Sequence, residues 1–327
     1  MNGDDCSNDS DLKDSHTLES GTNCTATLNH IPSGPCTLSW SHNSLVPIKV
    51  SSQLPISDRP PCILGVDEAG RGPVLGPMVY AVCYTLISHQ DKLKDIGFAD
   101  SKVLNETQRD KLFATIEKQS EWIGWAATVC SPQDISESML RRAKYNLNAL
   151  AHDTTINLIQ SVLDQGVNIQ EVYVDTVGSP ESYQAKLAKR FPKIGKIVVS
   201  KKADSLFPIV SAASICAKVT RDAILCNWEF VEPGIDSTQR AFGSGYPADP
   251  KTVAWLKKHL DPVFGFPRIV RFSWSTTAKL LEMQGVDVLW EDEVETDSHK
   301  PLFPNNESTK IWPVTSRIVQ TMKPCQF

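Results

Sequence analysis

The chain has 327 residues, 41% of them hydrophobic, and a formal net charge of -5. This length is enough to bury a full hydrophobic core, and it allows one large domain with extensions as readily as two domains. Because the net charge is slightly negative, the chain as a whole does not attract nucleic acid electrostatically. Any such binding must therefore come from local basic patches.

The cysteines and the apolar segments narrow the class of protein further. Nine cysteines are scattered without a Cys-x-x-Cys pair, which argues against a disulfide framework and against a structural zinc site. No apolar run approaches the ~20 residues of a membrane helix, and the first residues are acidic, unlike a signal segment. We therefore expect a soluble protein of a reducing intracellular compartment, with no membrane partner.

Composition divides the chain into three parts. Residues 1–60 are rich in Ser, Thr, Asn, Asp and Pro and poor in aromatic residues, which predicts a disordered N-terminal tail. Residues 61–284 contain strand and helix patterns and predict the folded domain. Residues 285–327 combine an acidic stretch with isolated apolar residues between prolines. This C-terminal extension is either a loosely ordered tail or a segment that docks on a partner.

Strand patterns come first in the folded part, and strands then alternate with helices. Apolar, β-forming runs predict strands over Cys62–Val66, Met78–Ile87, Ile123–Val129, Val172–Val174 and Ile197–Val199. Helical spacing predicts helices over Leu140–Leu163, Pro208–Trp228, Pro250–Leu260 and Ser275–Met283. This order predicts an α/β fold with a mixed central sheet flanked by helices and a helical C-terminal part.

Acidic residues recur where the predicted strands end. Asp67 and Glu68 close the first strand, Asp175 ends the fourth, and Asp204 comes shortly after the fifth. Because strand ends of such a sheet line the crevice where ligands bind, we expect these side chains to converge. A divalent cation would relieve their repulsion, and two such ions ~3.5–4 Å apart support phosphodiester hydrolysis. For any one of these aspartates, capping a turn or helix is the competing interpretation.

Asp67 and Glu68 are adjacent, and adjacent residues of a strand point to opposite faces. The two share a site only if the strand ends or twists there, and the glycines that follow favour an ending. Gly70, Gly72 and Gly76 do not form a dinucleotide fingerprint, because the last glycine is one position late and a strand follows. We interpret the turn as a close approach of backbone to ligand, with Arg71 contacting a phosphate, or else as a plain tight turn.

Eight short motifs in this order resemble one enzyme family. They are Asp67–Gly72, Asp100–Lys102, Tyr145–Asn148, Tyr173–Gly178, Lys202–Asp204, Ser211–Lys218, Gly243–Pro247 and Arg271–Trp274. From about Ile63 to Leu281 the sequence resembles the type 2 ribonucleases H, also called the ribonuclease HII family. It is most similar to the catalytic subunits of the eukaryotic members.

This resemblance implies an RNase H-like fold and a Mg²⁺- or Mn²⁺-dependent endonuclease that uses two divalent ions. The implied substrates are RNA–DNA hybrids and duplex DNA with single ribonucleotides, cut to leave 3′-hydroxyl and 5′-phosphate ends. Such activity removes misincorporated ribonucleotides and replication primers. The family's catalytic and metal-ligating carboxylates fall on Asp67, Glu68, Asp175 and Asp204. Its substrate-binding residues fall on Gly70, Arg71, Gly72, Lys102 and Tyr246.

Physical chemistry is consistent with these roles. A protein separates RNA from DNA through the 2′-hydroxyl, which backbone groups at Gly70 and Gly72 and the phenol of Tyr246 are suited to bind. Without the resemblance, an ordinary turn or half-buried tyrosine is the preferred interpretation of Tyr246, and a solvated surface lysine is as good an interpretation of Lys102 as a phosphate contact. The resemblance further implies a nuclear heterotrimer with two noncatalytic accessory subunits, with residues 285–327 as the candidate docking region.

A basic run supplies the local positive charge that nucleic-acid binding requires. No acid occurs between Glu181 and Asp204, and the interval contains Lys186, Lys189, Arg190, Lys193, Lys196, Lys201 and Lys202. These residues either hold a duplex backbone or form a solvated face.

Two other functions remain open. A resolvase-like two-metal enzyme would cut DNA without needing a 2′-hydroxyl, and a noncatalytic subunit would bind nucleic acid as a scaffold. The presence of all four carboxylates argues against the noncatalytic subunit.

Overall fold

The apolar runs of the sequence pair into one mixed sheet. In the computed structural model, which describes residues 28–32, 34–47, 50, 54–98, 104–143, 145–176 and 178–287, the strands are β1 (Trp40–Asn43), β2 (Cys62–Ala69), β3 (Met78–Leu86), β4 (Ile123–Cys130), β5 (Ile169–Asp175) and β6 (Lys196–Ser200). They lie in the order β1-β4-β3-β2-β5-β6. Pairing is antiparallel from β1 through β4 and β3 to β2, whereas β5 and β6 add in parallel.

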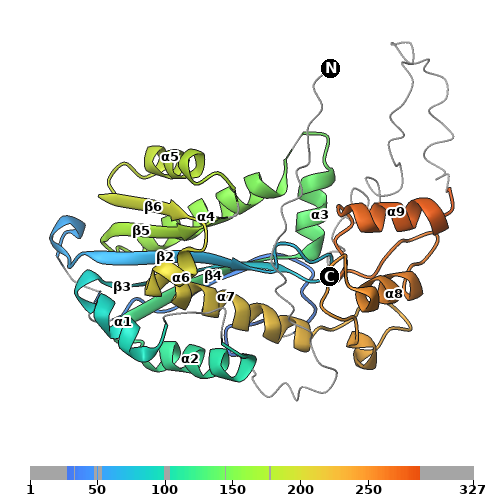
Figure 1. The fold of residues 1–327 in the computed structure, drawn as a ribbon, viewed down its shortest axis with the longest axis horizontal. Coiled ribbons are helices and arrows are strands. Elements are labelled where there is room, and N and C mark those ends of the chain that lie inside the picture. Colours follow the sequence, from blue (N-terminus) through green and yellow to red (C-terminus); the bar gives the residue numbers. More distant parts are fainter. Residues whose placement is uncertain are drawn as a thin grey trace, which may run out of the picture.

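Helices cover both faces of this sheet (Figure 1). They are α1 (Gln90–Ile96), α2 (Glu106–Lys118), α3 (Pro132–Leu140), α4 (Leu147–Asp164), α5 (Pro180–Arg190), α6 (Ala203–Leu206), α7 (Pro208–Cys226), α8 (Pro250–Lys258) and α9 (Ser275–Gln284). Short 3₁₀ helices lie at Ile56–Asp58, Ile87–His89 and Ser237–Arg240. α7 lies with α1 and α2 on one face, α4 and α5 lie on the other, and α8 and α9 lie beyond one end. The predicted fold class is confirmed.

Each strand predicted from the sequence is present, but one helix starts later than its apolar spacing predicts. The helix expected over Leu140–Leu163 begins only at Leu147, as α4, and Leu140 is instead the last residue of α3. The side chain of Asn146 caps α4 and accepts a hydrogen bond from the backbone N–H of Ala149 at 2.9 Å. Such a cap sets where a helix begins, and apolar periodicity does not reveal it.

β1 lies in the segment for which composition predicts a disordered tail. It pairs with β4, with Trp40 opposite Val129 and Asn43 opposite Ala126. The structure therefore differs from that expectation for the described residues between 28 and 47, while residues 1–27 lie outside the described part. Backbone hydrogen bonds attach this strand to the sheet, so it forms despite a composition that is poor in apolar residues.

Two apolar cores form because successive side chains of a strand point to opposite faces. In β2, Ile63 belongs to the core beneath α7, whereas Leu64 belongs to the core beneath α4 and α5. The backbone of α7 lies directly on β2 at Gly65, where an added Cβ atom would stand 2.4 Å from the carbonyl oxygen of Ile209. The same alternation directs Asp67 toward α7 and Glu68 toward α4 and α5.

Within the described ranges, no helix is both long and apolar enough to cross a membrane. Two expectations from the sequence concern other residues. Lys102 lies outside the described residues, and so does nearly all of the proposed docking region, of which only residues 285–287 are described.

Candidate active site

Asp67 and Glu68 lie within β2 and not after it. They pair with Ala81 and Tyr80 of β3, and the strand continues to Ala69. The strand therefore ends one residue after Glu68 and not between the two acids, which occupy opposite faces of the sheet. Asp67 is buried, with 5% of its surface exposed, and Glu68 is half-buried.

Asp175 and Asp204 approach the same edge from the parallel strands. Asp175 is the last residue of β5, and its Oδ1 accepts a hydrogen bond from the backbone N–H of Ala203 at 2.7 Å. Lys202 adopts a left-handed conformation with φ of 59°, so the chain turns sharply after β6 and α6 starts at Ala203. This turn buries Asp204, which is 2% exposed.

Electrostatic interactions place the four carboxyl groups in one site. Burial, followed by the charges of Asp175 and Glu68, raises the pKa of Asp67 well above its usual range. Burial and the charge of Asp175, with a smaller effect of Asp204, raise the pKa of Glu68 to about 7, although Arg71 acts in the opposite direction. Asp175 therefore acts on both faces of β2, which is why the two adjacent acids belong to one site.

α7 contributes two further neighbours of Asp67. A hydrogen bond from Ser214 and the charge of Lys218 both lower the pKa of Asp67 and so partly offset the effect of burial. The two residues are four apart, which places them on the same face of the helix. Sequence reasoning assigned them no role, although a serine and a lysine at this spacing in the mostly apolar first part of the helix are a usable signal.

The glycine turn after β2 is held by a buried arginine. Arg271 is 0% exposed, and it donates to the carbonyl oxygens of Gly70 at 2.5 Å, Arg71 at 3.0 Å and Gly76 at 2.8 Å. The indole N–H of Trp274 donates to the carbonyl oxygen of Gly72 at 3.1 Å. One arginine thus fixes three carbonyls of the turn, a role that the Arg271–Trp274 motif alone does not reveal.

The predicted substrate-binding residues gather around this turn. The ring of Tyr246 lies over Gly72, because a Cβ atom on Gly72 would stand 3.0 Å from Tyr246 Cε1. Gly70 has φ of +77°, and an added Cβ there would overlap the side chain of Arg221. Arg71 extends to the other side, where Nη1 donates to the hydroxyl of Tyr80 at 3.4 Å and Nη2 donates to Asn148 Oδ1.

The donor set suits a hard divalent cation. Carboxylate oxygens are preferred ligands of Mg²⁺, and a cation would offset both the burial and the repulsion that raise the pKa values of Asp67 and Glu68. Across the described ranges, no group of three or more Asp, Glu, His or Cys side chains forms a ready-made metal cage. Mg²⁺ does not need one, because it binds through one or two carboxylates together with water and substrate phosphate.

Sequence comparison assigns the family. The family model for ribonuclease HII matches residues 64–277. The chain belongs to the ribonuclease HII family. It is 57% identical over 247 residues to a ribonuclease H2 subunit of Bos taurus, an alignment that covers 76% of this chain and 82% of the relative. It is 56% identical over 245 residues to the corresponding subunit of Homo sapiens, which covers 75% of this chain and 81% of the relative.

Solved structures of ribonucleases HII have the same fold. The ribonuclease H2 from Pyrococcus horikoshii OT3 has a TM-score of 0.57 and 34% identity, over 68% of this chain and 98% of that one. The ribonuclease HII in a complex with PCNA from Archaeoglobus fulgidus has a TM-score of 0.55 and 30% identity, over 67% and 96%. This chain is therefore a ribonuclease H, and the resemblance drawn from its motifs is confirmed. Enzymes of this class depend on divalent metal ions.

Proposed function

We propose that this enzyme hydrolyses the RNA strand of RNA–DNA hybrids and incises duplex DNA at single ribonucleotides, leaving 3′-hydroxyl and 5′-phosphate ends. The observation that carries the proposal is the position of the glycine turn. It leads directly from the carboxylates Asp67 and Glu68 to Gly72, and the ring of Tyr246 lies over that glycine. A ribose bound at the turn would therefore present its neighbouring phosphodiester to the carboxylates.

One group of side chains would hold the metal ions for hydrolysis, and a second group would recognise the substrate. Asp67, Glu68, Asp175 and Asp204 would hold two divalent ions, Mg²⁺ or Mn²⁺, which supply positive charge for activating water and stabilising a leaving oxygen. Backbone groups at Gly70 and Gly72 and the phenol of Tyr246 would bind the 2′-hydroxyl, the group that distinguishes RNA from DNA. Arg71 and, by the family resemblance, Lys102 would contact phosphates of the bound strands.

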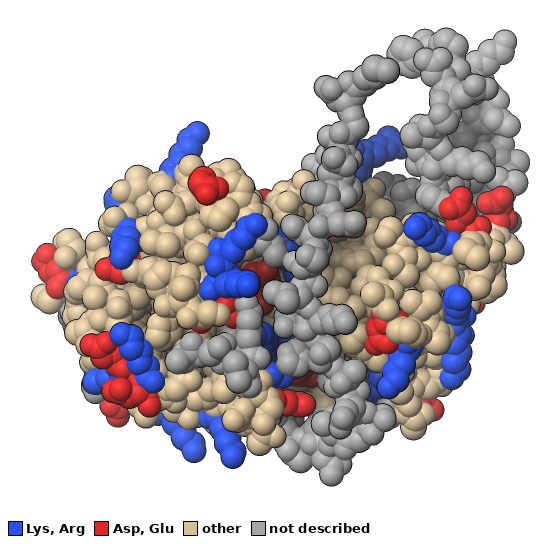
Figure 2. All heavy atoms as spheres, viewed as in Figure 1, with Lys and Arg blue, Asp and Glu red and all other residues tan. Residues whose placement is uncertain are grey.

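The basic run would hold the duplex backbone beside this site. Lys186, Lys189 and Arg190 are exposed on α5, and Lys193, Lys196, Lys201 and Lys202 are exposed on the segments that flank β6. Figure 2 places Lys and Arg side chains next to recessed acidic atoms near the centre of this face of the molecule. Lys186 forms an exposed ion pair with Asp153 at 3.2 Å, a contact of little energy that a phosphate could replace.

The biological setting follows from the relatives. The relatives from Bos taurus and Homo sapiens are named as subunits of ribonuclease H2, and we propose that this chain likewise works with two noncatalytic subunits. Its role would be to remove misincorporated ribonucleotides and replication primers in the nucleus.

Three matched duplexes test the proposed activity. The full chain, purified with its bound subunits, is incubated with Mg²⁺ and all-DNA duplex, the same duplex containing one ribonucleotide, or the RNA–DNA hybrid of that sequence. We expect cutting of the last two and no cutting of all-DNA. Asp67→Asn should abolish cutting, whereas Asp58→Asn, at an exposed aspartate ahead of β2, should not change it.

The alternatives give different patterns. Cutting of all three duplexes would support a resolvase-like DNA endonuclease. Binding without cutting, with metal and subunits present, would support a noncatalytic scaffold. Equal cutting by Asp67→Asn and the unsubstituted chain would show that the hydrolysis does not come from this site.

A further inference from the structure

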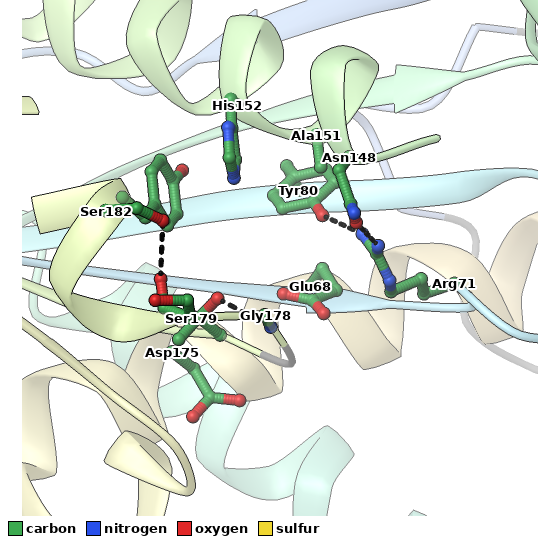
Figure 3. A pocket seen from close by; sticks show the side chains of 12 residues that line it. Glu68, Arg71, Tyr80, Asn148, Ala151, His152, Asp175, Gly178, Ser179 and Ser182 are labelled. Atoms are coloured by element: carbon green, nitrogen blue, oxygen red, sulfur yellow. Dashed lines mark hydrogen bonds between the residues drawn. The ribbon is translucent and has the colours of Figure 1, made fainter. Parts of the chain in front are cut away.

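A cavity of about 120 Å³ opens on the Glu68 side of β2, between that strand and helices α4 and α5 (Figure 3). Its lower wall is acidic and contains Glu68 and Asp175. Most of the remaining lining is polar or aromatic and includes Arg71, Tyr80, Asn148, His152, Ser182 and Tyr183.

His152 lies on the wall opposite these carboxylates. It projects from α4 into the cavity toward the strand that carries Glu68 (Figure 3). Its ring stacks on the buried ring of Tyr183, with centroids 3.8 Å apart and planes at 15°. Within the described part of the chain, no hydrogen bond to either ring nitrogen is present, so the stacking fixes the ring and leaves its polar edge for a ligand.

Two other features make the cavity suited to an anion. Arg71 enters the cavity with its guanidinium positioned by Tyr80 and Asn148, and a guanidinium can only donate hydrogen bonds. α5 begins at Pro180, and Gly178, Ser179 and Ser182 at its N-terminus line the cavity. At this terminus Pro180 has no N–H and the N–H of Gly178 already donates to Thr176 Oγ1 at 3.2 Å, so α5 contributes the partial positive charge of its N-terminus, which favours an anion.

We propose that this cavity binds a backbone phosphate of the strand that is cut, adjacent to the scissile phosphodiester, with His152 as a phosphate-contacting residue. This inference rests on the proposed function, since it takes the carboxylates as the place of hydrolysis. With one phosphate held between Arg71, His152 and the start of α5, the next phosphodiester along the strand falls beside Glu68 and Asp175. The cavity therefore sets the register of the strand.

Neutral phosphate analogues provide the test. Binding is measured with Ca²⁺, in place of Mg²⁺, to duplexes with one ribonucleotide in which each nearby phosphate of the cut strand is replaced in turn by a methylphosphonate. The protein is the full chain with its bound subunits, either unsubstituted or carrying His152→Phe. The phenyl ring retains the stacking on Tyr183 and removes both nitrogens, so a purely structural role of His152 would survive this change.

We expect one position at which the methylphosphonate weakens binding by the unsubstituted chain about tenfold, the scale of a hydrogen bond to a charged group. At that position it should have little further effect on His152→Phe, because both changes remove the same contact. His152→Gln, which restores a donor, should recover part of the loss. His89→Ala is the matched control, since His89 lies edge-on to Trp122 beyond the far end of β3 and should bind like the unsubstituted chain.

The phosphate contact would be overturned if, at every position, the methylphosphonate weakened binding by His152→Phe as much as binding by the unsubstituted chain. Unchanged binding of the duplexes by His152→Phe would overturn it as well. Cutting of the same duplexes with Mg²⁺ separates this result from the proposed function. If the two changes remove the same contact but no duplex is cut, the phosphate site is supported and the proposed hydrolysis is rejected. If the duplexes are cut but the two changes act independently, the proposed hydrolysis is supported and the phosphate site is rejected.

Discussion

The ring of Tyr246 covers Gly72 so closely that a Cβ atom at Gly72 would stand 3.0 Å from Tyr246 Cε1. We predict that Gly72→Ala displaces this ring and lowers cutting at a ribonucleotide by about 10–100-fold, the scale of a misplaced substrate group. Stability should change little, because Tyr246 is 36% exposed and can move. Cleavage rates and thermal unfolding of the variant measure both effects.

Gly195→Ala is the control for this change, since an added Cβ there would make only ordinary contacts, the nearest at 3.5 Å. Tyr246→Phe should also lower cutting, because it removes the hydroxyl and keeps the ring. Full activity of both Gly72→Ala and Tyr246→Phe would remove this pair from substrate selection.

Arg271 should be irreplaceable by lysine. Its guanidinium donates to three carbonyl groups of the turn from a fully buried position, and a lysine ammonium cannot reproduce this planar arrangement. We predict that Arg271→Lys lowers the free energy of unfolding by about 2–4 kcal/mol, because charged hydrogen bonds are lost in the interior. Chemical denaturation measures this, and a change below about 1 kcal/mol would contradict the proposed role.

The raised pKa values predict how metal and pH act together on stability. Between its usual value of 4.5 and about 7, Glu68 of the folded, metal-free chain retains a proton that the unfolded chain has lost. Stability should therefore fall as pH rises through this window. Because a metal ion binds the deprotonated carboxylates, Mg²⁺ should raise the melting temperature more above pH 7 than near pH 5.

Thermal unfolding with Mg²⁺ or with EDTA at several pH values checks this. Glu68→Gln should flatten the pH dependence and reduce the Mg²⁺ shift. An equal Mg²⁺ shift at all pH values would mean that the ion binds elsewhere.

His30 predicts a pH dependence of the opposite sign. Its ring packs against Trp125 and Phe113 and bonds to Thr220 Oγ1 at 3.1 Å, while burial and then His42 lower its pKa from 6.5 to about 4. As pH falls through this window, the unfolded chain takes up a proton that the folded chain does not, so stability is lost. The stability advantage over His30→Phe should therefore shrink between pH 7 and pH 4.

Denaturation of the two proteins at each pH gives this difference. Cutting activity at neutral pH should be the same in both, because His30 lies at the edge of the sheet beside β1 and outside the site. A difference in stability that is independent of pH would contradict burial of a neutral His30.

The strands and the acids at their ends could be predicted because both depend on short local patterns. Apolar runs mark β2 and β5, and the parallel pairing of these strands brings Asp175 beside Asp67 and Glu68. The sequence predicts a strand that closes with Asp67 and Glu68, and the strand continues to Ala69 because pairing with β3 extends through that residue. Pairing with a neighbouring strand sets that boundary, and it lies outside the local sequence pattern.

The supporting residues could not be predicted because their partners are distant in sequence. Arg271 bonds to a turn about 200 residues earlier, and His152 faces Glu68 only because α4 crosses that side of the sheet. β1 was missed for a related reason, since its stability comes from pairing with β4 and not from its own composition. Side chains that act through tertiary contacts leave no periodic signal.

The most direct test of the central claim compares two duplexes that differ by one oxygen atom. One contains a single ribonucleotide, and the other has the corresponding deoxyribonucleotide. Incubated with Mg²⁺ and the full chain with its bound subunits, only the first should be cut, with 3′-hydroxyl and 5′-phosphate ends, and Asp175→Asn should abolish the cut. Equal cutting of both duplexes, or undiminished cutting by Asp175→Asn, would contradict a ribose-dependent nuclease built on these four carboxylates.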